Sequence, residues 1–254
     1  MGVRRSLRKW ARKRYFLSRI SLLDTPMEYY VGKMMNGEVF SFSRYNDGEW
    51  NAILDKKGSN IDGHEYFPEL GARLRESIHQ PLKYIYAFGD KAMTLDGITI
   101  ARYLKDHGIN ITWYNCNVFH DTNMKGELYP LIAQLRKMQI VMVGPDHLRG
   151  LGEKVFAYQH FIEVPSRNCF LKVDQIKEEV LEYARSRKNL LFSFSASMAA
   201  KVLIYELYPL MGDRHWLIDF GSLWDIYVGV KSRGVHSEFD WGPILKKNLG
   251  TLSH

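Results

Sequence analysis

Short apolar segments alternate with amphipathic ones along most of the chain, and this alternation constrains the fold more than any other feature. Segments with strand length and composition occur at residues 39–45, 84–88, 109–114, 140–143, 161–164, 190–195 and 216–220. Helical periodicity lies between them, at about residues 50–54, 70–79, 96–107, 124–138, 174–187 and 196–204. Strands separated by helices of this kind are typical of βαβ units. The sequence therefore predicts an α/β, Rossmann-like domain with a mostly parallel sheet and helices on both faces.

The composition fits one packed domain. With 254 residues, 46% of them hydrophobic and 13% aromatic, the chain can build a substantial core. No internal repeat or interdomain linker is visible, so we expect a single α/β domain over residues 25–254, preceded by a separate segment at 1–24. Residues 231–254 show little periodicity. Two cysteines are too few for a disulfide framework or a zinc site, which favours a reducing compartment.

The charge is concentrated at the start of the chain. The formal net charge is +7, and residues 1–20 contribute eight cations and no acid, so the remainder is close to neutral. Apolar residues recur there at helical intervals, which predicts a basic amphipathic helix suited to an anionic membrane surface. A solvated extension or an ordinary packed helix is the alternative. A nucleic-acid-binding fold more often spreads its charge over a face, so no nucleic acid is expected. No apolar run approaches the roughly 18 residues that span a bilayer.

Two carboxylates stand where the first strand of the domain gives way to a helix. In Ser43-Arg-Tyr-Asn-Asp-Gly-Glu49, turn residues follow the strand, and ligands bind at this edge of open α/β sheets. On spacing alone, Asn46 and Glu49 fit a helix capping box. Alternatively, Asp47 and Glu49 could bind a hard divalent cation that neutralises a diphosphate. Arg44 would then donate hydrogen bonds to the phosphate, and Tyr45 would provide a stacking surface.

Polar side chains also follow later strands. The run 115–123 is dense in short polar residues and contains His120, either a general base or a packing histidine. Small residues at 195–197 open a helix whose free N–H groups could hold a phosphate. Asp219 and Asp225 flank the exit of the last strand and could supply a base, or cap a helix.

Common nucleotide and catalytic motifs are missing. The chain contains no G-x-x-x-x-G-K-[ST], no H-E-x-x-H and no G-x-S-x-G, and Gly150-Leu-Gly152 lacks the third glycine of a dinucleotide loop. Cys116 has no partner histidine that would mark it as a nucleophile. The residues alone thus leave open a nucleotide-binding methyltransferase or hydrolase, or a non-catalytic module that binds nucleic acid through its basic N-terminus.

Taken together, these motifs resemble the GT-D-fold glycosyltransferases of bacteria. The stretch 43–49 is similar to the arginine, turn and Asp-x-Glu signature of that family. The similarity extends over most of the chain after residue 25, through 117–121, 140–147, 161–168 with Asp174, 195–201 and 218–222. The turn Ser195-Ala-Ser197 carries no glycine, whereas the family often has one there.

The resemblance implies a hexosyltransferase-type enzyme (EC 2.4) that uses a nucleotide-diphosphate sugar, expected to be a UDP-sugar, with Mn²⁺ or Mg²⁺. Asp47 and Glu49 would hold the metal, directly or through water. A base among Asp225, Asp219 and His120 would deprotonate the acceptor. The residues expected to contact the nucleotide sugar are Arg44, Tyr45, Asn46, Gly48, Asn117, Ser195, Ser197, Lys201 and Asp219.

The resemblance also gives the basic N-terminus a role. It would dock a cytoplasmic enzyme peripherally on the inner face of the cell membrane, near a saccharide or lipid-linked saccharide acceptor used in surface polysaccharide or glycoconjugate assembly. The donor sugar, the acceptor, the stereochemistry of transfer and the oligomeric state stay open.

Overall fold

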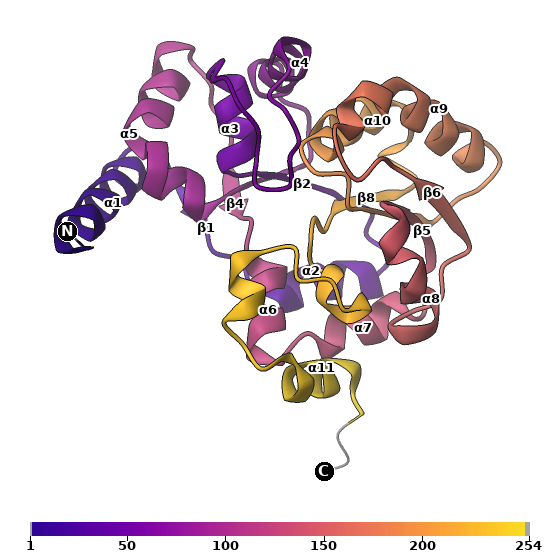
Figure 1. Ribbon diagram of the computed structural model, residues 1–254. Coiled ribbons are helices and arrows are strands. Elements are labelled where there is room, and N and C mark those ends of the chain that lie inside the picture. Colours follow the sequence, from indigo (N-terminus) through magenta and orange to yellow (C-terminus); the bar gives the residue numbers. More distant parts are fainter. Residues whose placement is uncertain (1, 252–254) are drawn as a thin grey trace.

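The computed structural model describes residues 2–251, with side chains from residue 6 onward (Figure 1). Within these residues, one sheet of eight strands is joined by eleven α-helices and four short 3-10 helices. The strands are β1 (Leu22–Leu23), β2 (Ser41–Tyr45), β3 (Ile85–Phe88), β4 (Trp113–Asn115), β5 (Gln139–Gly144), β6 (His160–Glu163), β7 (Leu190–Phe194) and β8 (Trp216–Asp219). The α-helices are α1 (Gly2–Leu17), α2 (Met27–Met35), α3 (Asp47–Ile53), α4 (Pro68–His79), α5 (Asp90–Asp106), α6 (Val118–Lys125), α7 (Tyr129–Leu135), α8 (Leu151–Lys154), α9 (Val173–Ala184), α10 (Ala199–Met211) and α11 (Trp241–Leu249). The 3-10 helices are η1 (Asp146–Gly150), η2 (Cys169–Lys172), η3 (Asp225–Val228) and η4 (Gly234–Ser237).

The sheet is parallel throughout, with strand order β1-β4-β3-β2-β8-β7-β5-β6. From β2 the chain moves outward through β3 and β4. It then crosses to the other side, and only β8 returns to pair with β2. Such a change of direction opens a crevice at the carboxyl ends of the two strands, which is where ligands bind in open α/β sheets.

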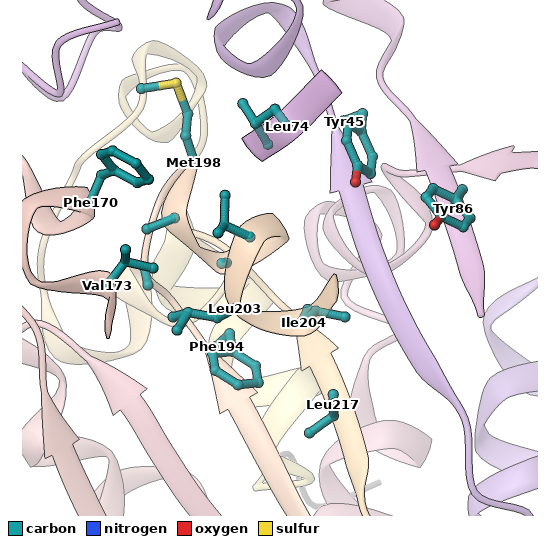
Figure 2. Packing of buried hydrophobic residues seen from close by; sticks show 14 of the residues in the cluster. Tyr45, Leu74, Tyr86, Phe170, Val173, Phe194, Met198, Leu203, Ile204 and Leu217 are labelled. Carbon is teal, nitrogen blue, oxygen red and sulfur yellow. The ribbon is translucent and has the colours of Figure 1, made fainter. Parts of the chain in front are cut away.

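Each face of the sheet carries its own hydrophobic core, because successive strand residues point to opposite faces. On one face, α1, α3, α4, α5, α9 and α10 cover strand residues such as Tyr45 and Phe194 (Figure 2). On the other face, α2, α6, α7, α8 and α11 cover Phe42 and Ile218. The predicted α/β, Rossmann-like fold with helices on both faces is confirmed.

The N-terminal helix α1 packs along α5. Phe16 is fully buried, with its ring centroid 4.4 Å from that of Phe88. Gly97 allows this approach, because a Cβ there would lie 2.7 Å from the carbonyl oxygen of Arg12. The opposite side of α1 is open, with Leu7 and Trp10 each 58% exposed. Among the described residues, no helix combines the length and apolar character needed to cross a membrane.

Several elements differ from the sequence pattern, including the helices α2 and α8, which were not predicted. The helix expected at about residues 124–138 is shorter and corresponds to α7, whereas much of the polar run 115–123 forms α6, which Gly126 ends in a left-handed conformation (φ +75°). The two-residue strand β1, which pairs with β4, was not predicted. Nor was α11, which lies in the stretch with little periodicity and begins with an Asp240 cap. The most buried residue of α11 is the polar Asn248, which forms hydrogen bonds with the backbone N–H of Leu128 and with the carbonyl oxygen of Asn123. Because a polar residue faces the core here, the apolar periodicity of the sequence does not indicate this helix.

Candidate functional site

A cavity of about 540 Å³ opens at the carboxyl ends of β2 and β8, and we call it the switch-point cavity. Its volume is usual for a small-molecule site. Nine of the thirteen site residues expected from the sequence line it: Arg44, Asn46, Asp47, Gly48, Glu49, Asn117, His120, Ser197 and Lys201. Further lining residues are Asn60, Ile61, Lys91, Asp121, Asn123, Met124, Met198, Gly221, Ser222, Arg233, Gly234, Val235, His236 and Trp241.

Asp47 and Glu49 lie in the first turn of α3 but have different surroundings. Asp47 is partly exposed and pairs with Lys91, with Nζ and Oδ2 2.7 Å apart. Glu49 is buried, and its Oε2 accepts the backbone N–H of Asn46 at 2.8 Å, as expected for a capping box. Its Oε1 lies 2.9 Å from Lys201 Nζ. Both Glu49 oxygens are therefore engaged, whereas Asp47 presents its carboxylate to the cavity.

Lys201 joins two carboxylates below the cavity floor. Its Nζ lies 2.9 Å from Glu49 and 2.8 Å from Asp219, and all three side chains are at most 8% exposed. Burial alone would raise the pKa of Glu49, but Lys201 and the Asn46 N–H outweigh it, so this pKa lies below the ordinary value. Burial alone would lower the pKa of Lys201, but Asp219 and Glu49 raise it above the ordinary value. Glu49 and Lys201 are thus both charged near neutral pH.

Arg44 reaches from the end of β2 across the cavity floor. Its Nε and Nη1 donate to the carbonyl oxygens of Cys116 and Phe220 at 3.1 and 3.0 Å. Gly221 makes this path possible, since a Cβ at this residue (φ +56°) would lie 2.4 Å from Arg44 Nη1. The guanidinium is therefore held by backbone atoms from two strand exits, with its charge available to a ligand in the cavity.

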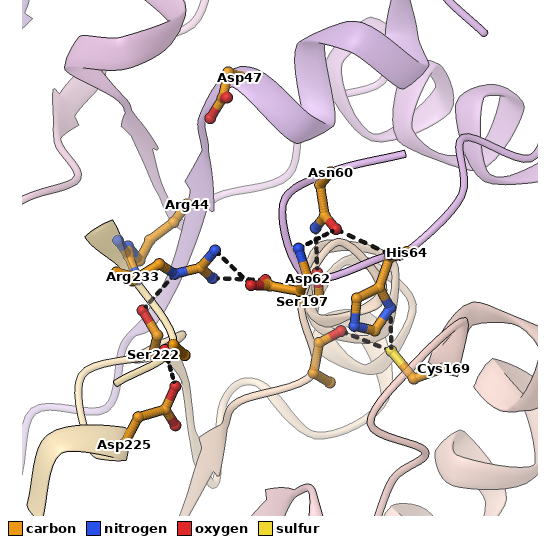
Figure 3. Close-up of polar contacts among 12 residues, drawn as sticks. Arg44, Asp47, Asn60, Asp62, His64, Cys169, Ser197, Ser222, Asp225 and Arg233 are labelled. Carbon is orange, nitrogen blue, oxygen red and sulfur yellow. Dashed lines mark hydrogen bonds and ion pairs between the residues drawn. The ribbon is translucent and has the colours of Figure 1, made fainter. Parts of the chain in front are cut away.

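The turn before α10 holds Ser197 in a conformation that favours glycine. Its φ is +49°, and its hydroxyl oxygen accepts a hydrogen bond from Asn60 Nδ2 at 3.0 Å (Figure 3). Left-handed backbone costs a non-glycine residue about 1–2 kcal/mol.

We expect Ser197→Gly to be about 1 kcal/mol more stable than Ser197→Ala, the reverse of the usual order. Both variants lose the bond from Asn60, but only glycine relieves the left-handed strain. Urea unfolding of the two variants measures the difference. A more stable alanine variant would show that the backbone at 197 is unstrained.

Two histidines face the other side of the switch-point cavity. Burial and the nearby Arg44 and Arg233 hold the pKa of His120 well below its usual range. Burial also lowers the pKa of His236. The Nδ1 atoms of both rings are buried without a hydrogen-bond partner among the described residues. Both rings are thus neutral, and each has a polar atom that a ligand could satisfy.

Four expected residues lie outside the switch-point cavity. Tyr45 is fully buried on the face of β2 that α3, α4 and α10 cover, where its ring stacks on that of Tyr86 (Figure 2). Its hydroxyl forms a hydrogen bond with that of Ser77. In this position Tyr45 offers no stacking surface to a ligand. Asp219 is also fully buried, beneath the floor with Lys201. Ser195 and Asp225 line a second, adjoining cavity of about 180 Å³.

Several lining residues were not singled out from the sequence. Lys91 directly follows β3, so the rule that ligands bind at strand ends would have found it, whereas Asn60 lies in the 55–70 loop between α3 and α4. Arg233 and His236 come from the stretch without periodicity, and no sequence signal marks them. Arg233 forms two bonds of 2.9 Å to Asp62 and one of 3.0 Å to Ser222, joining that stretch to the 55–70 loop (Figure 3).

The donor set fits a hard divalent cation at Asp47 only together with a ligand. Among the described residues, no group of three or more His, Cys, Asp or Glu side chains could hold a metal by itself. Mg²⁺-type ions are commonly bound by one or two carboxylates plus substrate phosphates, and Asp47 can supply one such carboxylate. Direct contact from Glu49 would require its pair with Lys201 to open.

Comparison with known proteins agrees with this architecture. No family model matches the chain. A curated protein of Streptococcus gordonii described as "Probable glycosyl transferase Gly" is 25% identical over 258 residues, covering 91% of this chain and 34% of that protein. The chain therefore spans about one third of the curated relative that it matches.

Two solved structures of the domain of unknown function 1792 have the same fold. One is described with the words "has a distinct glycosyltransferase fold"; it is 19% identical with a TM-score of 0.62, covering 85% of this chain and 82% of that one. The selenomethionine-substituted structure gives a TM-score of 0.60 with the same identity and coverage. The glycosyltransferase fold expected from the sequence motifs, and the resemblance itself, are thereby confirmed.

Proposed function

We propose that this chain transfers a sugar from a nucleotide-diphosphate donor to a hydroxyl acceptor, with the donor bound in the switch-point cavity. One observation carries the proposal: the partly exposed carboxylate of Asp47 lies with the cationic side chains of Arg44, Lys91 and Arg233 in one cavity at the junction of β2 and β8. Such a set complements a diphosphate, whose charge grows as the sugar leaves. The glycosyltransferase fold of the compared structures supports the same reaction class.

The donor diphosphate is placed near Arg44 and the start of α10. The helix N-terminus offers free N–H groups and a favourable dipole. The remaining cavity, towards Met124 and Trp241, is left for the nucleoside. Uridine is the nucleoside that the family resemblance leads us to expect.

Asp47 would hold Mn²⁺ or Mg²⁺ together with the donor phosphates. When bound, the cation would stabilise the negative charge on the leaving diphosphate. Glu49 acts in this proposal through its neighbours, because it fixes the Asn46 turn and keeps Lys201 charged and in place. Asp47 and Glu49 therefore have separate roles, one at the ligand and one beneath it.

Thermal-shift measurements test the assignment. We expect UDP-sugars to raise the melting temperature in the presence of Mn²⁺, and GDP- and CMP-sugars to do so less, because ligands that bind only the folded state stabilise it. Apo protein with Mn²⁺ alone is the control. Stabilisation by none of the nucleotide sugars, with or without the metal, would refute the proposed donor site.

We also propose that α1 docks the protein on an anionic lipid surface. Leu7, Trp10 and Leu17 are 58%, 58% and 43% exposed and follow one another at helical spacing, interspersed with cations including Arg14, which lies over the Trp10 ring. Exposed apolar residues flanked by basic ones are suited to an interfacial helix. Lys13 pairs with Asp90 beside Lys91, so α1 lies at the same edge of the sheet as the cavity. Docking there would bring the cavity to a membrane-bound acceptor.

The double variant Leu7→Ser/Trp10→Ser is expected to bind anionic vesicles about tenfold or more weakly, because each lost apolar insertion contributes on the order of 1 kcal/mol or more. Flotation with phosphatidylglycerol-containing and pure phosphatidylcholine vesicles measures it. Leu171→Ser/Leu210→Ser, at two exposed leucines elsewhere, is the matched control. Equal binding by both double variants would exclude docking through α1. Deleting the helix is less informative, since Phe16 belongs to the core.

A further inference from the structure

The second cavity adjoins the switch-point cavity at the carboxyl ends of β5 and β7. Its volume is about 180 Å³, and it shares Ser197, Gly221, Ser222 and Arg233 with the larger cavity. That volume is many times the roughly 10–15 Å³ that one water molecule requires in such a cavity, so the second cavity can hold a small polar ligand such as one sugar ring. A molecule seated in the second cavity would thus lie next to the proposed donor without overlapping it.

A histidine and an aspartate form a directed pair in this second cavity. His147 Nε2 donates to Asp225 Oδ1 at 3.1 Å, because a carboxylate can only accept. The hydroxyl of Ser232 donates to the other oxygen, Oδ2. The Asp225 side chain is 8% exposed, whereas that of His147 is 34% exposed. The buried carboxylate thus orients the ring through an Nε2–H donor, which leaves Nδ1 as the ring nitrogen that can act as a base.

An unpartnered hydroxyl lies in the same cavity. Ser195 Oγ is buried and makes no hydrogen bond within the described part of the chain. Buried polar atoms are normally satisfied, so each exception suggests a missing partner. A ring hydroxyl of a sugar would provide both a donor and an acceptor for it.

The geometry points to the second cavity as the acceptor site, with one acceptor sugar ring bound there and His147 as its catalytic base. This inference rests on the proposed function and adds the acceptor side to it. Nδ1 of His147 takes the proton of the acceptor hydroxyl, and the acceptor oxygen forms a bond to the anomeric carbon of the donor. The bond from that carbon to the diphosphate oxygen breaks, and its electron pair leaves with the nucleoside diphosphate. A single displacement of this kind inverts the anomeric configuration.

Asp225 is a positioning residue in this scheme, in the way that a buried aspartate selects the tautomer of a catalytic histidine. The other two bases considered are less suitable. Asp219 is fully buried with its Oδ2 on Lys201, out of reach of an acceptor. His120 has a pKa held far below its usual range by burial and two arginines, which makes its ring a weak base.

Three variants test the inference: His147→Ala, Asp225→Asn and, as control, His160→Ala at an exposed ring stacked on Tyr183. The donors are UDP-glucose, UDP-galactose and UDP-N-acetylglucosamine, and the acceptors are the methyl β-glycosides of the same sugars. We expect His147→Ala to lower kcat about 100-fold or more with KM for the donor and calorimetric UDP affinity unchanged, and free imidazole to restore part of kcat. The control should transfer at the unsubstituted rate.

Asp225→Asn should cause a comparable loss by reversing the tautomer, since an amide can donate to Nε2. The ¹⁵N shifts of His147 report this directly, as Nε2–H in the unsubstituted chain and Nδ1–H in the variant. An unchanged tautomer in Asp225→Asn would show that Asp225 does not position the proton of His147, which contradicts its role here.

The outcomes distinguish failure of the acceptor site from failure of the donor site. Transfer by His147→Ala at the unsubstituted rate, loss of UDP binding in that variant, or a product with retained anomeric configuration overturns the inference. The inference also fails, while the proposed donor site stands, if the unsubstituted chain binds UDP but glycosylates none of these single-ring acceptors. Failure to bind UDP refutes the proposed function itself.

Discussion

Replacing Asp47 by asparagine is expected to lower metal-dependent sugar transfer by about 10²–10⁴-fold, because a cation on a leaving diphosphate contributes several kcal/mol and each 1.4 kcal/mol is a factor of ten. Asparagine keeps the size of the side chain but removes the charge that would attract the metal. Stability should change little, since the Asp47–Lys91 pair is partly exposed and such pairs contribute at most about 1 kcal/mol. Rates of UDP release at several Mn²⁺ concentrations measure the effect.

Asp96→Asn is the matched control for Asp47→Asn. Asp96 also pairs with a half-exposed lysine at 2.7 Å, and its side chain is 27% exposed, against 25% for Asp47. It does not line the switch-point cavity, so this variant should transfer sugar at the unsubstituted rate. Equal rates in both variants would mean that the Asp47 carboxylate has no part in the reaction.

Replacing Lys201 by methionine is expected to lower the free energy of unfolding by about 3–5 kcal/mol, because it leaves Glu49 and Asp219 buried without their shared cation. Methionine fills most of the volume of the lysine stem, so the loss reports charge and not packing. Urea unfolding at neutral pH gives the value. Lys177→Met is the control, since its pair with Glu206 at 2.7 Å is about one quarter exposed and should change stability by less than about 1 kcal/mol.

The pH dependence of the same pair of proteins provides a second readout. The pKa of Glu49 is lowered in the fold, so its contribution is present above the ordinary glutamate pKa and is lost as pH falls through the lowered value. The pKa of Lys201 is raised, so its contribution is complete below the ordinary lysine pKa and is lost only as pH rises through the raised value. The stability difference between the unsubstituted chain and Lys201→Met should therefore shrink below the glutamate range. A difference independent of pH in that range would contradict an ion-pair origin.

The fold and much of the site follow from strand periodicity. Alternating apolar strands and helices determine a parallel sheet, and the carboxyl ends of its strands meet at one edge. This rule predicts that the 44–49 turn, Asn117, His120 and the 195–201 turn lie at one edge of the sheet, and residues from each of them line the two adjoining cavities there. These residues are close to strand ends in the sequence, so local pattern was enough to locate them.

Residues that act across long sequence separations could not be located in the same way. Arg233 reaches the site from a segment without periodicity, and its partner Asp62 is distant in the sequence. The pairing of Lys201 with Glu49 and Asp219 likewise depends on β8 returning beside β2. Tyr45 differs, because strand parity already sets its side chain on the opposite face from Arg44 and could have excluded it.

The 46–49 turn forms the expected capping box, between Glu49 and Asn46, and also brings Asp47 to the cavity. Capping is therefore the means by which the chain fixes this carboxylate at the crevice. We expect the nucleotide sugar to bind at this crevice.

A structure determined with UDP and Mn²⁺ tests that claim most directly. We expect the diphosphate at the carboxyl ends of β2 and β8, within contact of Arg44 and the start of α10, and the metal ion on Asp47. A different cavity, of about 460 Å³, lies at the opposite edge of the sheet and is lined by residues including Lys33, Tyr84 and Tyr208. UDP bound in that cavity, or a diphosphate at β2 and β8 without contact to Arg44 and Asp47, would contradict the account.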